Sequence, residues 1–77
     1  MEPWEERFLK EYEELLNRTG KLARMLHNWK EGTLEFTPKC PFELLDEQLG
    51  VMCKYLDILE QRAKIEGIRL QTENPSK

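Results

Sequence analysis

Residues 44–66 read LLDEQLGVMCKYLDILEQRAKIE, a stretch that carries two apolar rows along one predicted helix. The first row repeats at alternating steps of four and three residues, which is the spacing of a helix that packs against another helix. This row comprises Leu45, Leu49, Met52, Leu56, Leu59 and Ala63. The second row runs beside the first and comprises Val51, Tyr55, Ile58, Arg62 and Ile65. Because the two rows cover an arc of roughly 200°, one neighbouring helix cannot bury both of them.

Arg62 is the unusual member of the second row, because an unpaired charge on an apolar face is costly. One interpretation is structural: the guanidinium forms a salt bridge with Glu66 or with an acid of a neighbouring chain, or it extends past Tyr55 into water. The other interpretation is functional, since guanidinium groups bind phosphates through paired hydrogen bonds and stack on nucleobases. In a symmetric assembly, several copies of Arg62 would then form a receptor for a symmetric polyanion.

Another long helix is predicted over residues 3–30. Pro3 suits the first turn of a helix, and the glutamates that follow it favour a helix N-terminus. Apolar or neutral residues then recur at the same alternating steps, at Phe8, Tyr12, Leu15, Thr19, Leu22, Leu26 and Trp29. Gly20 costs up to ~1 kcal/mol relative to alanine inside a helix, and it leaves room for the close approach of a neighbour or a ligand.

Residues 31–41, EGTLEFTPKCP, form the connection between the two predicted helices. Gly32 and the two prolines of this segment are typical of a chain that leaves one helix and enters another. We expect Leu34 and Phe36 to fold back as a plug over the helix ends. We also expect Cys40 to pack within the connection.

The second helix is predicted over about residues 41–66, with Gly67 directly after its last turn. A short connection makes two long helices antiparallel neighbours. The sequence therefore predicts an all-α fold, a long antiparallel helical hairpin that forms a single domain over residues 1–70. Residues 71–77 are predicted to be a polar C-terminal tail.

A chain of 77 residues buries only about 60% of its unfolded surface, so it usually needs a disulfide, a metal or a partner subunit. The two cysteines, Cys40 and Cys53, and the single histidine, His27, do not have the spacing of a metal site. We therefore expect no disulfide, metal or other cofactor, and instead a helical homo-oligomer. Its expected interface is the apolar part of the second row, namely Val51, Tyr55, Ile58 and Ile65.

Charge and composition argue against several classes of protein. A net charge of −3 disfavours binding to duplex nucleic acid, and no apolar run approaches the ~20 residues that span a bilayer. No charged segment followed by an apolar one indicates secretion, so we expect a cytoplasmic protein. The sequence has no glycine-rich phosphate loop, and its only serine is Ser76 in the tail, so we expect no enzyme.

Two segments carry a resemblance to a known family: EERFLKEYEELLNRTGKLARML at residues 5–26 and LLDEQLGVMCKYLDILEQRAKIEGI at residues 44–68. They resemble small bacteriophage proteins of crAss-like and other phages, a family that includes the anti-CBASS sponges, which sequester cyclic oligonucleotide immune signals. The family motifs match at Glu14, Leu15, Arg18, Lys21, Leu22, Gln48, Leu49, Met52, Tyr55, Leu59 and Arg62.

The resemblance implies a homo-oligomer, a hexamer in the characterised sponges, with two kinds of ligand site. Cyclic dinucleotides would bind between subunits near the first helix, where the candidate residues are Lys21 and one of the aromatics Trp4, Phe8 and Tyr12. Cyclic trinucleotides would bind at a site on the second helix, where the candidate is Arg62.

Three functional hypotheses remain open from the sequence, of which the third is a purely structural small subunit. The first is a phage anti-defence protein that binds cyclic oligonucleotides in an infected bacterial cell without hydrolysing them. The alternative is a helical module that inhibits or caps a host or phage protein through the second apolar row.

Overall fold

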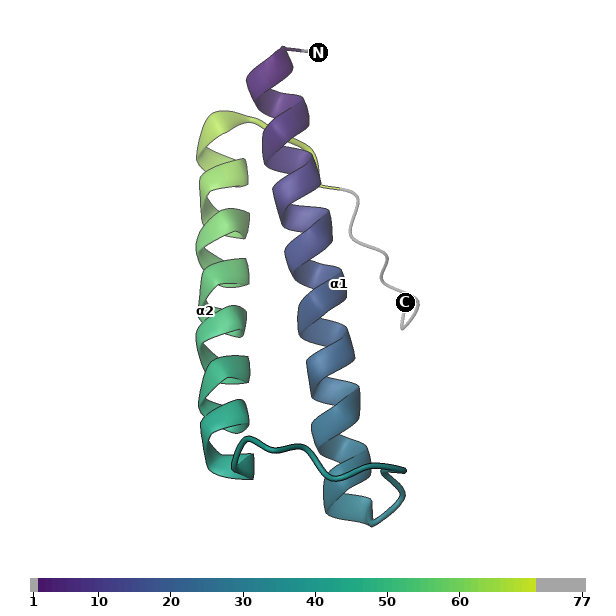
Figure 1. Cartoon of the computed structure of the whole chain (residues 1–77). Coiled ribbons are helices and arrows are strands. Elements are labelled where there is room, and N and C mark those ends of the chain that lie inside the picture. The colour runs from purple at the N-terminus through teal and green to yellow at the C-terminus, as the bar shows by residue number, and fades with distance from the viewer. Residues whose placement is uncertain (1, 71–77) are drawn as a thin grey trace.

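The computed structural model of the chain describes residues 2–70 and contains two helices in this range, α1 (Pro3–Glu31) and α2 (Phe42–Glu66). The helices lie side by side and run in opposite directions, joined at one end by residues 32–41 (Figure 1). The predicted all-α antiparallel hairpin is therefore confirmed, while the assembly of several copies stays a prediction. The predicted tail over residues 71–77 lies outside the described residues.

The helix ends follow from local backbone chemistry. At the start of α1, the carboxylate of Glu5 accepts a hydrogen bond from the backbone N–H of Glu2 at 2.8 Å. This satisfies one of the donors that a helix N-terminus leaves free. Both helices end at a glycine in the left-handed conformation, Gly32 with φ 80° and Gly67 with φ 75°. After each glycine, a backbone N–H returns to a carbonyl of the last turn, which closes the helix.

The core divides into two parts along the hairpin. Near the start of α1, the buried cluster consists of Phe8, Tyr12, Leu59, Ala63 and Ile68. Ile68 belongs to it because the chain turns back across α1 after α2 ends (Figure 1). Ile68 lies beyond the last periodic residue of the second helix, so its burial is a finding of the tertiary structure.

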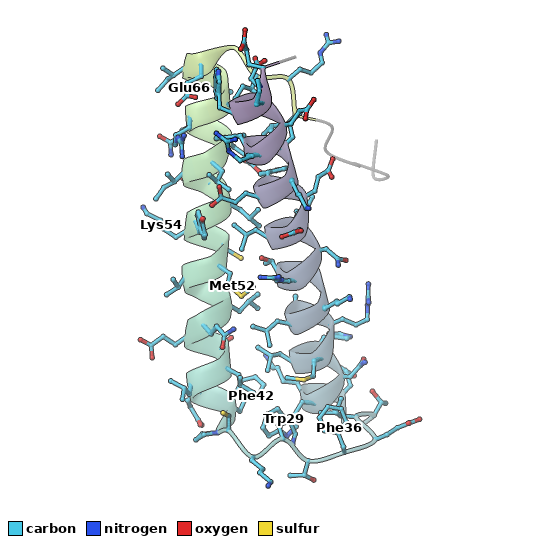
Figure 2. All side chains as sticks on the ribbon, turned by 45° about the horizontal axis from the view of Figure 1, so that its top comes forward. Trp29, Phe36, Phe42, Met52, Lys54 and Glu66 are labelled. Atoms are coloured by element: carbon cyan, nitrogen blue, oxygen red, sulfur yellow. The ribbon has the colours of Figure 1, made fainter. Side chains whose placement is uncertain are left out.

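At the connected end, aromatic packing replaces the expected plug. The rings of Trp29 and Phe42 meet edge to face, with centroids 5.3 Å apart and an interplanar angle of 78°. Phe36 instead keeps 59% of its surface exposed, and Leu34 is half-buried. Figure 2 shows the three aromatic residues near the connection. The predicted plug is wrong for Phe36, because Trp29 and Phe42 already fill the space between the helix ends.

The two cysteines are free and exposed. The expectation that Cys40 packs within the connection is therefore wrong, because the connection has no interior of its own. Neither α1 nor α2 is long and apolar enough to cross a membrane, as judged over residues 2–70.

Candidate functional site

Arg62 lies near the end of α2, beside the first turns of α1. Its guanidinium carbon is 4.9 Å from the centroid of the Phe8 ring, and its Nε is 3.4 Å from Glu66 Oε2. Half of the Arg62 side chain is nevertheless exposed. The expected contact with Glu66 is present, and the ring of Phe8 supports the guanidinium from below by a cation–π contact. These two contacts orient the Arg62 guanidinium at the surface of the hairpin.

The second apolar row is exposed in the single chain. Exposed fractions are 63% for Val51, 41% for Tyr55, 43% for Ile58 and 84% for Ile65. Leu44, which is 55% exposed, and the exposed Gln48 continue the row toward the start of α2 at the same alternating steps. We call the full set the exposed α2 row: Leu44, Gln48, Val51, Tyr55, Ile58, Arg62 and Ile65. As predicted from the combined width of the two rows, α1 covers only the first row of α2.

Two tyrosines link α2 to α1, one on either side of the contact between the two helices. The Tyr12 hydroxyl donates a hydrogen bond to Glu60 Oε2 at 2.8 Å, and the Tyr55 hydroxyl donates one to Glu11. Burial, together with the hydrogen bond and the charge of Glu60, raises the pKa of Tyr12 to about 12. These bonds hold the two helices in one register, and the bond to Glu11 shows which side of α1 adjoins the exposed α2 row.

The candidates on α1 do not form one site within a single chain. Phe8 and Tyr12 are 5% and 2% exposed, so their ring faces pack in the core and are closed to a ligand in this arrangement. Trp4 is 42% exposed, and Lys21 is exposed as well. However, 17 residues separate them on one straight helix, a span of about 25 Å at about 1.5 Å per residue. A small ligand that touches both must therefore lie between two chains.

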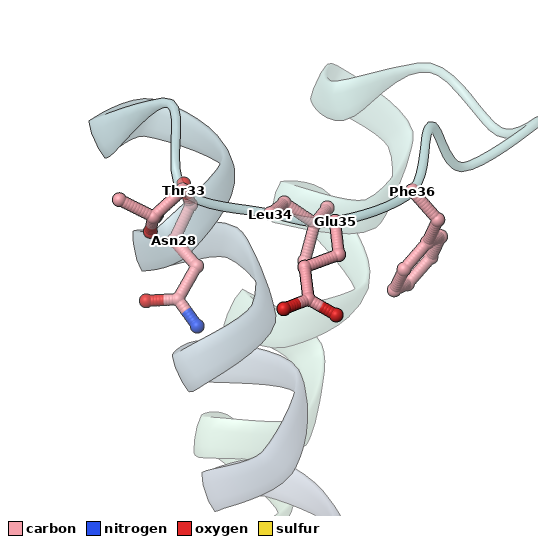
Figure 3. Close-up of a pocket in the computed structure, with 5 residues that line it drawn as sticks. All are labelled: Asn28, Thr33, Leu34, Glu35 and Phe36. Carbon is pink, nitrogen blue, oxygen red and sulfur yellow. Dashed lines mark hydrogen bonds between the residues drawn. The ribbon is translucent and has the colours of Figure 1, made fainter.

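The described surface has shallow hollows that the sequence did not predict. Figure 3 shows the first, about 280 Å³, in which Asn28, Glu35 and Phe36 surround the start of the connection. The Glu35 carboxylate disfavours an anion there. A second hollow of about 280 Å³ lies beside Ile68. A third, about 410 Å³, is a groove on α2 lined by Leu44, Glu47, Gln48 and Val51.

The groove on α2 is mainly apolar, because Leu44 and Val51 expose their side chains on either side of it. Gln48 adds an amide with both donors and an acceptor, and its only hydrogen bond within residues 2–70 is a weak one to the Met52 sulfur at 3.7 Å. The signal that predicts this groove is the continuation of the second row to Leu44, two turns before Val51, the first residue of the predicted row. Over the described residues, no three His, Cys, Asp or Glu side chains come close enough to hold a metal ion.

These features define a small all-α hairpin with an uncovered apolar row and a positioned arginine within it. A model of the Sequestin family matches residues 2–65, which is most of the chain, and the chain therefore belongs to the Sequestin family. The family name denotes sequestration, in agreement with the resemblance to small sponge-like phage proteins. No curated protein and no solved structure matches the chain.

Proposed function

We propose that this protein binds and sequesters a small cyclic nucleotide signal of bacterial immunity, without hydrolysing it. Cyclic di- and trinucleotides are the first candidate ligands, and cyclic ADP-ribose isomers are related ones. The protein would act for a phage in the cytoplasm of the infected cell. Sequestration requires binding alone. This suits a hairpin whose described residues offer an oriented guanidinium, that of Arg62, beside exposed apolar surface.

The observation that carries the proposal is the position of Arg62. Its guanidinium is stacked on Phe8 and tethered to Glu66, yet half of the side chain is open to solvent. A planar donor that is already oriented loses little entropy when it binds a phosphate, and this favours tight binding. The apolar residues on either side of it, Ile58 and Ile65, provide surface against which a base can pack.

Family membership supports the same conclusion at a coarser level, since the Sequestin name implies a captured ligand. Trp4 and Lys21 remain candidates for a further site at an interface between chains. Their separation on α1 requires that each come from a different subunit.

A thermal-melt screen tests the proposal directly. The purified protein is melted with cyclic dinucleotides, cyclic trinucleotides and cyclic ADP-ribose isomers, with the linear nucleotides as controls. We expect one cyclic ligand to raise the Tm by several degrees at concentrations well above its Kd. In Arg62→Ala the protein should stay folded and the shift should disappear. The matched control is Arg24→Ala, which removes an exposed arginine from α1 and should keep the shift.

The exposed α2 row also favours the alternative function, a helical module that caps another protein. Val51 and Ile65 expose apolar surface of the kind that protein interfaces bury. In that case no cyclic nucleotide changes the Tm of the folded protein, and Arg62→Ala affects only contacts with a protein partner. A flat ligand panel would therefore replace the first proposal with this one.

A further inference from the structure

The exposed α2 row has a property that sequence spacing and exposure reveal together. Its members follow alternating steps of four and three residues over the whole helix, which is the pattern of a coiled-coil seam. Since α1 packs on the other row of α2, this seam has no partner within residues 2–70. A helix that covers this seam must therefore come from outside these residues.

The order and spacing of apolar and polar residues in the row are nearly the same when it is read from either end. Gln48 and Arg62 each lie seven residues from Tyr55, at the centre of the row. Val51 and Ile58 lie four and three residues from Tyr55. Leu44 and Ile65 lie eleven and ten residues from it. A second α2 in the opposite direction, related by a two-fold axis at Tyr55, therefore places apolar residues against apolar ones and Arg62 beside Gln48.

Charges on α1 independently favour the same axis. Glu11 contacts Tyr55, so its side of α1 adjoins the exposed α2 row, and Glu14, Arg18 and Lys21 follow on that side at helical spacing. The contacts of Phe8 with Arg62 and of Trp29 with Phe42 place the middle of this charged run at the level of Tyr55.

A reversed copy about that axis therefore sets acids opposite bases, Glu11 against Lys21 and Glu14 against Arg18. A parallel copy would instead set each charge against itself, including Arg62 against Arg62. Like charges directly opposite one another are unfavourable, and opposite charges are favourable. The charge pattern thus selects the antiparallel arrangement over the parallel one.

We infer that a second copy of this chain docks on the exposed α2 row in antiparallel orientation, with a two-fold axis at Tyr55. The result is a four-helix arrangement in which the two α2 helices pair through apolar residues and the two α1 helices pair through charges. Arg62 of each copy then faces the α2 groove of the other copy, and its guanidinium comes within reach of Glu47 there.

The pairing also completes the site of Arg62, and this part rests on the proposed function. The groove of about 410 Å³ supplies apolar walls from Leu44 and Val51, a hydrogen-bonding amide from Gln48 and the carboxylate of Glu47, which a bound phosphate would have to displace from Arg62. A ligand with a phosphate on Arg62 of one copy can insert its base into the groove of the other. Each dimer would then hold two equivalent sites, one at each end of the seam.

Cysteine cross-linking tests the orientation without any ligand. Cys40→Ser and Cys53→Ser remove the native thiols, which are exposed. In this background, Leu44→Cys and Ile65→Cys are expressed separately and together, and then oxidised. We expect a disulfide-linked dimer when the two variants are co-expressed and little when each is alone. Efficient cross-linking of either variant with itself would mean a parallel pairing, and no cross-link in any combination would also overturn the inference.

A charge exchange tests the contact between Arg62 and Glu47. Arg62→Glu and Glu47→Arg should each weaken dimerisation by about tenfold or more, because each puts like charges together. The double variant should return to within a few fold of the wild type, as measured by analytical ultracentrifugation. Additive losses in the double variant would contradict the contact even if each single variant folds well.

A substitution at Gln48 tests the ligand site formed by Arg62 of one copy and the α2 groove of the other. Gln48→Ala should reduce the ligand-induced rise in Tm, measured at a protein concentration at which ultracentrifugation shows the variant to be dimeric. If cross-links form but no cyclic nucleotide shifts the Tm, the proposed function fails while the antiparallel dimer stands. If a ligand shifts the Tm equally in wild type and Gln48→Ala, the groove is not part of the site.

Discussion

At the scale of single residues, Tyr12 is both a buried core residue and a hydrogen-bond donor between the two helices. Its ring is one of the most buried in the hairpin, while its hydroxyl donates to Glu60 of α2 at 2.8 Å. The same burial that closes the ring to a ligand makes the tyrosinate form unfavourable. The pKa of Tyr12 therefore stands at about 12, against an ordinary value of 10.0.

This shift predicts a loss of stability in alkaline solution. The folded protein holds the Tyr12 proton more tightly than the unfolded chain does. The contribution of this proton to the free energy of unfolding is therefore fully present below pH 10. It is lost as the pH rises from 10 to 12, by roughly 1–3 kcal/mol of the free energy of unfolding. Urea denaturation across this range measures it.

The control for this prediction is Tyr12→Phe. It removes the hydroxyl at a cost of about 1 kcal/mol at neutral pH, because the exposed Glu60 regains water. Its unfolding free energy should fall less steeply than that of the wild type between pH 10 and 12. Equal slopes in the two proteins would show that Tyr12 does not titrate abnormally.

At the scale of elements, the two glycines Gly20 and Gly67 have different effects on their helices. Gly20 lies in the middle of α1, and a Cβ built on it meets no atom within 4 Å. Gly67 ends α2 with φ 75°, a conformation that residues with a side chain adopt at a cost. The first glycine therefore weakens its helix, whereas the second one terminates its helix.

We expect Gly20→Ala to raise the free energy of unfolding by about 0.5–1 kcal/mol, because alanine loses less backbone entropy in a helix. Gly67→Ala should lower it by about 1 kcal/mol because of the left-handed φ. Both changes add one methyl group, so each is the control for the other in thermal or urea unfolding. A destabilising Gly20→Ala would mean that a neighbouring chain approaches α1 closely at that point.

At the same scale, sequence periodicity was sufficient for the helices and insufficient for the segments between and after them. Alternating steps placed both apolar rows correctly, and glycines marked both helix ends. The positions of Phe36, Cys40 and Ile68 could not be predicted in this way, since a connection has no period. Their burial depends on which space the helices leave free, and Trp29 with Phe42 occupies the space expected for Phe36.

At the scale of the whole molecule, the hairpin is elongated, with extents of 44 × 26 × 18 Å. Such a shape buries little of a short chain, and the exposed α2 row is the consequence. Its apolar residues lie on the same helix that carries Arg62, so assembly and ligand binding are expected to be coupled. A ligand bound between copies would stabilise the assembly by mass action.

Assembly predicts that the Tm depends on protein concentration. We expect the wild-type Tm to rise over an approximately hundredfold increase in concentration, since association stabilises the folded state. Ile58→Asp places a charge in the exposed α2 row and should give a folded protein whose Tm no longer depends on concentration. Phe36→Ser is the matched control, because it removes an apolar side chain of similar exposure outside the row, and it should retain the dependence.

The amino-acid sequence by itself determined that the chain forms two long antiparallel helices, that one row of α2 packs on α1, and that another row lies beside it. These features are periodic, and periodicity is a local property of a helix. Only the tertiary structure decided that Phe8 and Tyr12 are closed within the core while Arg62 rests on Phe8 with half of its side chain open. That outcome depends on the register of one helix against the other, which is set by contacts between residues far apart in the sequence.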